Sequence, residues 1–158
     1  MRRLATPAAL CTLPGGKGGG QAAGASIVDV LVGDVEPGGR LAETFPKSMV
    51  FPSEENFTAR QRQVQYREGL FVGYRFHNTA EVETRFAFGH GLSYTAFEWA
   101  EVTVTGSGCD LTVAVTVTNT GSRAGSDVVQ LYVRDVESTV YRPDRELQAF
   151  AKVHVAPG

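Results

Sequence analysis

The sequence predicts a mainly β protein, in which an antiparallel sandwich follows one N-terminal helix and a long extended linker. The strongest indication is Leu111–Thr118, where apolar and polar residues alternate as in a strand with one buried face. Similar runs lie at Val102–Thr105, Val128–Val133 and Leu147–Val155, and turn residues such as Asn119–Gly121 separate them. Four short strands at this spacing are typical of an antiparallel sandwich.

Composition limits the classes of partner and the location. The 158 residues carry a formal charge of −2, which gives no electrostatic basis for binding nucleic acid or an anionic membrane. No apolar run reaches the roughly 20 residues of a membrane-spanning helix. Because Met1–Cys11 lacks the apolar stretch of a secretory signal, we expect a cytoplasmic location for the chain as encoded. Cys11 and Cys109 are expected to be free, buried or half-buried thiols, with a disulfide as the open alternative.

The first ordered part is expected between residues 13 and 46 as loop, helix and strand. A glycine-rich stretch from Gly15 to Gly20 precedes a helical pattern in which Ala23, Ile27, Val30 and Leu31 recur at helical spacing. Gly33 is expected to cap the helix. A turn over residues 36–39 and a strand over residues 40–45, ended by Pro46, complete this part.

Residues 47–96 are less regular. Residues 51–57 are expected to form an exposed loop, and Tyr66–Phe76 carries four aromatic residues among charges and glycines. We interpret Tyr66–Phe76 as an extended segment lying across another surface. The run Phe86–Phe97 places His90 between two glycines and leads directly into the first strand.

These runs resemble consecutive parts of glycoside hydrolase family 3, which includes β-glucosidases and β-xylosidases. The matching motifs are Pro14–Gly20 with Ile27–Pro46, Tyr66–Arg75, Phe88–Thr95, Val115–Gly121 with Val128–Val133, and Arg142–Phe150. The resemblance implies a poorly matching segment (1–12), a remnant of an α/β-sandwich domain (13–46), a linker (47–96) and a fibronectin type III-like sandwich (97–158). Lys17 departs from a frequent Glu of the family, and Ala87 from a Pro before the Phe-Gly pair.

The resemblance also implies what this stretch leaves out. Retaining glycosidases need a nucleophilic carboxylate and an acid/base carboxyl about 5–5.5 Å apart. In the family these groups belong to an N-terminal barrel and to an earlier part of the α/β sandwich, so no catalytic residue can be carried over to this chain. We therefore expect a fragment cut at both ends, with the last strands of the sandwich missing.

Three linker residues are the candidates for chemistry of the chain's own. Glu68 could act as an acid beside a second carboxylate; the alternative is that it pairs with an arginine such as Arg67 or Arg75 and fixes the linker. His90 and Ser93 are spaced so that an acyl-transfer pair is conceivable, yet such a pair also needs an orienting carboxylate and an oxyanion hole. The alternative for His90 is that its imidazole hydrogen-bonds the backbone and fixes the loop.

No cofactor is predicted, and the sequence leaves a divalent cation open. The three histidines, His77, His90 and His154, do not cluster in sequence. A hard cation such as calcium would need aspartates and backbone carbonyls. Asp34, Asp127 and Asp135 are the candidates, without the spacing of a calcium-binding loop.

The function predicted from these observations is a non-catalytic accessory or interaction module of glycoside hydrolase ancestry. One alternative is a small stand-alone hydrolase of glycosidic or ester-like bonds, with a site built from linker residues across a dimer. Another is a carbohydrate-binding module. Half a sandwich leaves sheet edges uncovered, so we expect a homo-oligomer with Tyr66–Phe76 in its interface.

Overall fold

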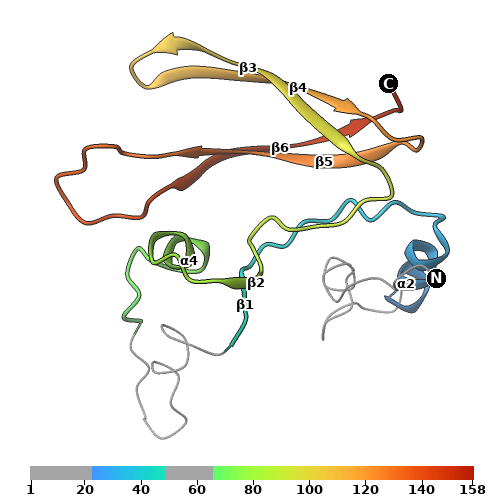
Figure 1. The fold of residues 1–158 in the computed structure, drawn as a ribbon, viewed down its shortest axis with the longest axis horizontal. Coiled ribbons are helices and arrows are strands. Elements are labelled where there is room, and N and C mark those ends of the chain that lie inside the picture. The colour runs from blue at the N-terminus through green and yellow to red at the C-terminus, as the bar shows by residue number, and fades with distance from the viewer. Residues whose placement is uncertain (1–22, 49–65) are drawn as a thin grey trace, which may run out of the picture.

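The computed structural model describes residues 23–48 and 66–158, and this part is mainly β with antiparallel pairing in every sheet (Figure 1). The predicted fold class is therefore confirmed. The glycine-rich stretch, the 51–57 loop and Cys11 lie outside the described residues. The elements are α2 (Ala23–Val32), β1 (Phe45–Pro46), α4 (Tyr74–Thr79), β2 (Thr84–Phe86), β3 (Phe97–Ser107), β4 (Asp110–Asn119), β5 (Gly125–Val133) and β6 (Glu146–Val155).

Strands β3 and β4 form a hairpin with a two-residue loop. Gly106 has a φ of 112°, and a Cβ there would lie 2.0 Å from the carbonyl oxygen of Asp110. Only glycine fits this close approach of the two strands. Cys109 lies in the loop, exposed and unpaired, so the expectation of a buried or half-buried thiol is wrong for this residue. The loop was too short to provide any cover for the side chain.

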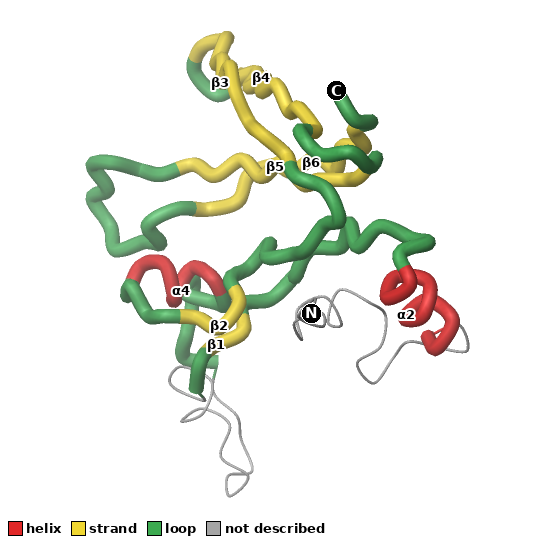
Figure 2. The backbone as a smooth tube through the Cα atoms, turned by 45° about the vertical axis from the view of Figure 1, so that its right-hand side comes forward, coloured by secondary structure: helices red, strands yellow, loops and turns green. Residues whose placement is uncertain are grey.

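Strands β5 and β6 form the second hairpin, with Gly125 opposite Val155 at one end and Val133 opposite Glu146 at the other. The two hairpins lie one above the other and come together near the C-terminus, as Figures 1 and 2 show from two directions. In the part of the chain that the structure describes, each sheet has two strands. Every strand of the hairpins therefore has one unpaired edge.

Helix α2 lies apart from the sheets (Figure 2) and ends as predicted. Gly33 has a φ of 90°, its backbone N–H donates to the carbonyl of Val30, and the N–H of Asp34 donates to the carbonyl of Asp29. This left-handed glycine gives the last carbonyls of the helix partners. Among the described helices none is long and apolar enough to cross a membrane.

Two predicted elements differ from the structure. The strand expected over residues 40–45 is shortened to β1. Leu41 makes its backbone hydrogen bonds to Gly89 and His90, and regular pairing with β2 begins at Phe45. The prediction of an extended segment over Tyr66–Phe76 is wrong for most of its length, because residues 67–70 form a turn and residues 74–76 belong to α4. Gly69 and Gly73, with φ of 55° and 59°, reverse the chain, and α4 begins directly after Gly73.

Burial is sparse in this fold. Among the described residues, the buried apolar side chains are Val30 and Leu41, each 6% exposed, together with Pro37 and Pro143. By contrast Trp99 is 46% and Phe150 is 73% exposed, although both lie on hairpin strands. The hairpins therefore leave much of their apolar surface open.

Candidate functional site

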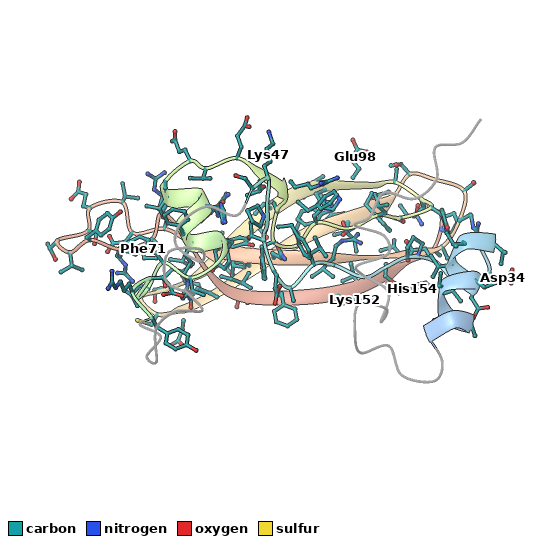
Figure 3. All side chains as sticks on the ribbon, turned by 90° about the horizontal axis from the view of Figure 1, so that it is seen from below. Asp34, Lys47, Phe71, Glu98, Lys152 and His154 are labelled. Carbon is teal, nitrogen blue, oxygen red and sulfur yellow. The ribbon has the colours of Figure 1, made fainter. Side chains whose placement is uncertain are left out.

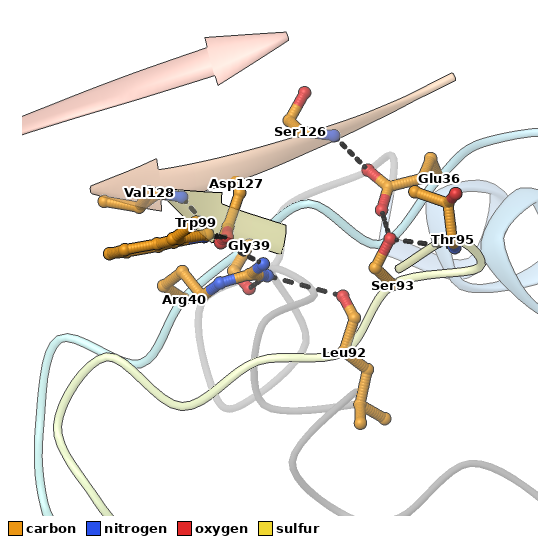
Figure 4. A network of polar contacts seen from close by, with 10 residues as sticks. All are labelled: Glu36, Gly39, Arg40, Leu92, Ser93, Thr95, Trp99, Ser126, Asp127 and Val128. Carbon is orange, nitrogen blue, oxygen red and sulfur yellow. Dashed lines mark hydrogen bonds and ion pairs between the residues drawn. The ribbon is translucent and has the colours of Figure 1, made fainter. Parts of the chain in front are cut away.

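A cluster of polar side chains, here called the polar junction, joins the loop after α2 to both hairpins. It consists of Glu36 and Arg40 from that loop, Ser93 from the segment before β3, Trp99 from β3 and Asp127 from β5 (Figure 4). Because these residues are spread over about ninety positions, the polar junction defines how the early and late parts of the chain are held together.

Arg40 and Asp127 form the centre of the polar junction. Arg40 Nη2 lies 2.8 Å from Asp127 Oδ1, and the two side chains are 15% and 13% exposed. Trp99 Nε1 donates to Asp127 Oδ2 at 3.0 Å, and the backbone N–H of Val128 donates to Oδ1 at 2.8 Å. Burial alone would raise the pKa of the Asp127 carboxyl, but these hydrogen bonds outweigh it, so the pKa lies below its ordinary value. A carboxylate bound in this way holds its partners in place and is not available as a free base.

Glu36 makes the second set of contacts. The Ser93 hydroxyl donates to Glu36 Oε1, and the backbone N–H of Ser126 donates to Oε2 at 3.3 Å. Ser93 Oγ in turn accepts from the backbone N–H of Thr95 at 3.1 Å. Ser93 is thus held by a carboxylate and by the backbone, and it fixes the entrance to β3.

Asn119 ties the two hairpins together next to the polar junction. It is completely buried. Its Nδ2 donates to the carbonyls of Arg123 at 2.7 Å and Val155 at 2.9 Å, while Oδ1 accepts from the Thr95 hydroxyl and from the N–H of Gly121. Every hydrogen-bonding position of the amide is engaged, which makes a buried amide favourable.

The predicted candidates His90, Ser93 and Glu68 occupy different surroundings. The His90 ring packs against Phe86 with centroids 5.1 Å apart, and its backbone N–H and carbonyl bond Ala87 and Leu41. Ser93 bonds Glu36, and no hydrogen bond joins it to His90 in the described part of the chain. The geometry gives both residues contacts that shape the linker, and neither contact assembles a nucleophile with its base.

Glu68 lines a small cavity of about 190 Å³ together with Phe71 and Tyr141, whose rings stack 4.7 Å apart. Its Oε2 is buried without a hydrogen-bond partner. Arg75, one of the two arginines proposed for it, lies 3.5 Å from Glu146 instead. Phe71 and Asp34 mark opposite ends of the molecule (Figure 3), so the Glu68 cavity lies far from α2.

The candidate cation ligands are not brought together. Asp127 belongs to the polar junction, and Asp135 pairs with Arg142 at 3.2 Å. Over residues 23–48 and 66–158, no three His, Cys, Asp or Glu side chains group as metal ligands.

The second feature of the site is an apolar cleft of about 260 Å³ between the two hairpins. Trp99 and Val102 of β3, Val113 of β4, Leu131 of β5 and Phe150 of β6 line it. Facing apolar strands in a sandwich normally close over a dry core. Here the exposed Trp99 and Phe150 leave an apolar surface of the kind that marks an interaction site.

Of the polar junction, the sequence analysis singled out Ser93 and Asp127, and it missed Glu36, Arg40 and Trp99 and the pairings between them. Arg40 and Asp127 are 87 positions apart, and nothing local indicates that they meet. Asn119 was interpreted only as a turn residue. Asn119 ends an alternating strand and begins a turn. That position was the one sequence signal that its side chain could bond both hairpins.

Comparison with known proteins agrees with this architecture. The description "Glycosyl hydrolase family 3 C-terminal domain" fits residues 16–94, and "Fibronectin type III-like domain" fits residues 127–158. Thermostable beta-glucosidase B of Acetivibrio thermocellus is 49% identical over 145 residues, which are 89% of this chain and 19% of that protein. A beta-glucosidase of Rhizobium radiobacter is 50% identical over 147 residues, or 88% of this chain and 18% of that protein.

Solved structures give the same result. A beta-glucosidase from Kluyveromyces marxianus superposes with a TM-score of 0.82 at 41% identity, covering 89% of this chain and 17% of that one. Beta-glucosidase 3B from Thermotoga neapolitana in complex with glycerol gives 0.82 at 38% identity, covering 88% and 20%. The chain thus spans about a fifth of the length of the curated relatives that it matches.

Proposed function

Because the chain belongs to glycosyl hydrolase family 3, we propose that it is an accessory and interaction module of a β-glucosidase-like glycoside hydrolase. In this role it supplies a rigidly joined C-terminal unit and a surface for association, and another part of the protein performs hydrolysis. The names of its relatives favour β-glucosides as the substrates of the whole protein.

The observation that carries the proposal is the open apolar cleft. Two isolated hairpins are at best marginally stable in water, and a sheet normally needs three or more strands with a buried face. The cleft residues Val102 and Phe150 are 67% and 73% exposed. Covering these two side chains in a complex would stabilise it by about 1.5–3 kcal/mol each, which favours a partner bound at this surface.

The polar side chains support the same role. The carboxylates of Glu36 and Asp127 are engaged by Ser93, Ser126, Arg40 and Trp99. These bonds hold the loop after α2 against the strands and leave both groups unavailable as a free acid and base. A fixed relation between the two matched domains is what an accessory module requires.

We propose that two copies of the chain associate through the apolar cleft and the unpaired strand edges next to it. Unpaired edges offer rows of N–H and C=O groups to a second chain, and an isologous pair of clefts would cover both apolar faces at once. Part of the predicted interface segment is also free for this contact, since Tyr66 and Leu70 are 82% and 58% exposed.

The test measures hydrolytic activity and the molar mass of the chain in solution. The purified chain should release no nitrophenol from nitrophenyl β-glucoside or nitrophenyl acetate, and light scattering should show a dimer at micromolar concentration. Phe150→Ser should weaken the dimer about tenfold or more, while Val136→Ser, at an exposed residue outside the cleft, should leave it unchanged. Turnover that disappears in Glu68→Gln or His90→Ala would support the stand-alone hydrolase instead, and a monomer at all concentrations would refute the association.

A further inference from the structure

Strand β4 has one edge that is turned away from β3, and in the part of the chain that the structure describes no other strand pairs with it. Phe97 of β3 lies opposite Asn119, and the N–H of Thr120 donates to the carbonyl of Ala96. Because bonding alternates along an antiparallel pair, Asn119 and every second residue before it direct their backbone groups to the open side. The open stretch, here called the β4 edge, is residues 111–117, and its outward-directed residues are Leu111, Val113, Val115 and Val117.

The ends of the β4 edge are set by the chain itself. The carbonyl of Asn119 accepts from the N–H of Gly158 at 3.2 Å, so the residues after β6 occupy the edge at that point. The two hairpins come together near the C-terminus and diverge away from it (Figure 1). Asp110 and the hairpin loop bound the other end. The midpoint of the free stretch is therefore Ala114.

The other three hairpin strands carry features that hinder pairing with a second chain. The register of β3 is interrupted by a bulge, where Glu101 has a φ of 53°. The N–H of Ser126 on β5 donates to the carboxylate of Glu36, and the N–H of Leu147 on β6 donates to the Tyr74 hydroxyl. Bulges, charged side chains and covering contacts are the devices that protect sheet edges in natural proteins.

The β4 edge lacks these devices. Residues 111–117 include no charged residue and no proline, so two copies of the stretch can pair without placing like charges opposite each other. Val113 and Val115 line the apolar cleft. The alternate side chains of Thr112, Ala114 and Thr116 are exposed and belong to the other face of the sheet. The stretch is therefore complementary to a second copy of itself in charge and in pattern.

We propose that two copies of the chain join by antiparallel pairing of their β4 edges, about a two-fold axis that passes through Ala114. The inference rests on the association proposed above and names the strand and the register that make it. Val113 of one copy then lies opposite Val115 of the other, and Thr112 lies opposite Thr116. Pairs of β-branched residues and of threonines stabilise antiparallel strands. The small Ala114 meets its own copy at the axis, in the kind of pair where two strands approach most closely.

The pairing also explains how the apolar cleft is used. Strands β3 and β4 of both copies form one sheet, and a two-fold axis perpendicular to that sheet leaves both sets of cleft-lining valines on the same face. The apolar cleft of one copy therefore continues into that of the other. A sheet of more than two strands with one apolar face is the arrangement that is stable in water, unlike an isolated hairpin.

The first test is hydrogen exchange of the full ¹⁵N-labelled chain, followed by NMR below and above the concentration at which light scattering detects association. The amides of Val113 and Val115 face the open side in a single copy and are bonded in the pair. We expect them to exchange at least about tenfold more slowly in the associated form. The amide of Val136, an exposed residue in the loop after β5, is the control and should show no change.

The second test determines the register. In a chain with Cys11→Ser and Cys109→Ser, Ala114→Cys should form an intermolecular disulfide under mild oxidation. Facing residues of this kind of pair have Cα atoms about 4.5 Å apart, which a disulfide can span. Thr112→Cys is the matched control on the same face of β4. In the proposed register its two copies lie roughly 14 Å apart along the strands, so they should cross-link at least about tenfold more slowly.

The outcomes separate this inference from the association on which it rests. A dimer whose Val113 and Val115 amides exchange as fast as in the single copy would overturn the β4 pairing, while the association itself would stand. Equal cross-linking of folded Ala114→Cys and Thr112→Cys would overturn the register in the same way. A chain that stays monomeric at every concentration would overturn both.

Discussion

Replacement of Asn119 is the most direct test of how the two hairpins are joined. Asn119→Ala removes four hydrogen bonds and leaves the carbonyls of Arg123 and Val155, the Thr95 hydroxyl and the Gly121 N–H to find other partners. At about 1 kcal/mol of net stability per bond, the loss should be about 4 kcal/mol. For a chain of this size that corresponds to a fall in Tm of about 8–16 °C.

The assay is urea denaturation followed by fluorescence of the single tryptophan, Trp99, which lies on β3 and belongs to the polar junction. The control is Thr112→Ala, an exposed position on β4, which should change the free energy of unfolding by less than about 0.5 kcal/mol. A loss below about 1 kcal/mol in Asn119→Ala, with an unchanged m-value, would refute the reasoning that this amide joins the hairpins.

Asn119→Asp sharpens the same prediction. A carboxylate keeps the shape of the amide but places a negative oxygen against the carbonyls of Arg123 and Val155. The variant should therefore be at least as unstable as Asn119→Ala at pH 7. Because burial raises the pKa of such a carboxyl, stability should return as the pH falls below that raised value, when the protonated group can donate to one carbonyl.

Three further predictions follow from other contacts. The pKa of the Asp127 carboxyl is lowered in the folded chain, so its stabilising effect is present above the ordinary carboxyl pKa and is lost as the pH falls through the folded-state value. Thermal unfolding measured between pH 5 and 2 should therefore show a smaller loss of stability with falling pH in Asp127→Asn than in the parent. The pKa of His77 is lowered in the folded chain, which disfavours protonation of the folded state. Stability should therefore decrease as the pH drops below the ordinary histidine pKa. Differential scanning fluorimetry should show a Tm that depends less on pH in His77→Gln than in the parent. Gly106→Ala should destabilise the β3–β4 hairpin by more than 2 kcal/mol, and Gly108→Ala, whose Cβ meets nothing within 4 Å, by about 1 kcal/mol; equal amide-exchange rates in the two variants would contradict the steric argument.

The strands of the fold were predictable because their signal is local. The alternation over Leu111–Thr118 indicates β4, and the glycine after the helical pattern at Gly33 indicates the end of α2. The segment Tyr66–Phe76 was harder, since its glycines permit both an extended chain and the reversals that the structure contains. Local pattern does not decide between these, and packing of Tyr74 on Phe88 and Tyr132 favours the helical turn.

The site was less predictable than the fold for a physical reason. Hydrogen bonds such as Arg40 with Asp127 or Glu36 with Ser93 join residues that only the completed fold brings together. The sequence singled out Ser93 for its nearness to His90 in the chain. In the structure Ser93 instead bonds a carboxylate 57 positions away, because the loop after α2 runs beside the segment that leads into β3.

The wide separation of Arg40 and Asp127 along the chain also has a kinetic consequence. The β3–β4 hairpin closes over a two-residue loop, and hairpins of this kind form in about 1–10 μs. The ion pair instead closes a loop of 87 residues, with the entropic cost that accompanies such a loop. Contacts between residues so far apart in sequence slow folding. The hairpins are therefore expected to form first, and the loop after α2 to dock onto them last.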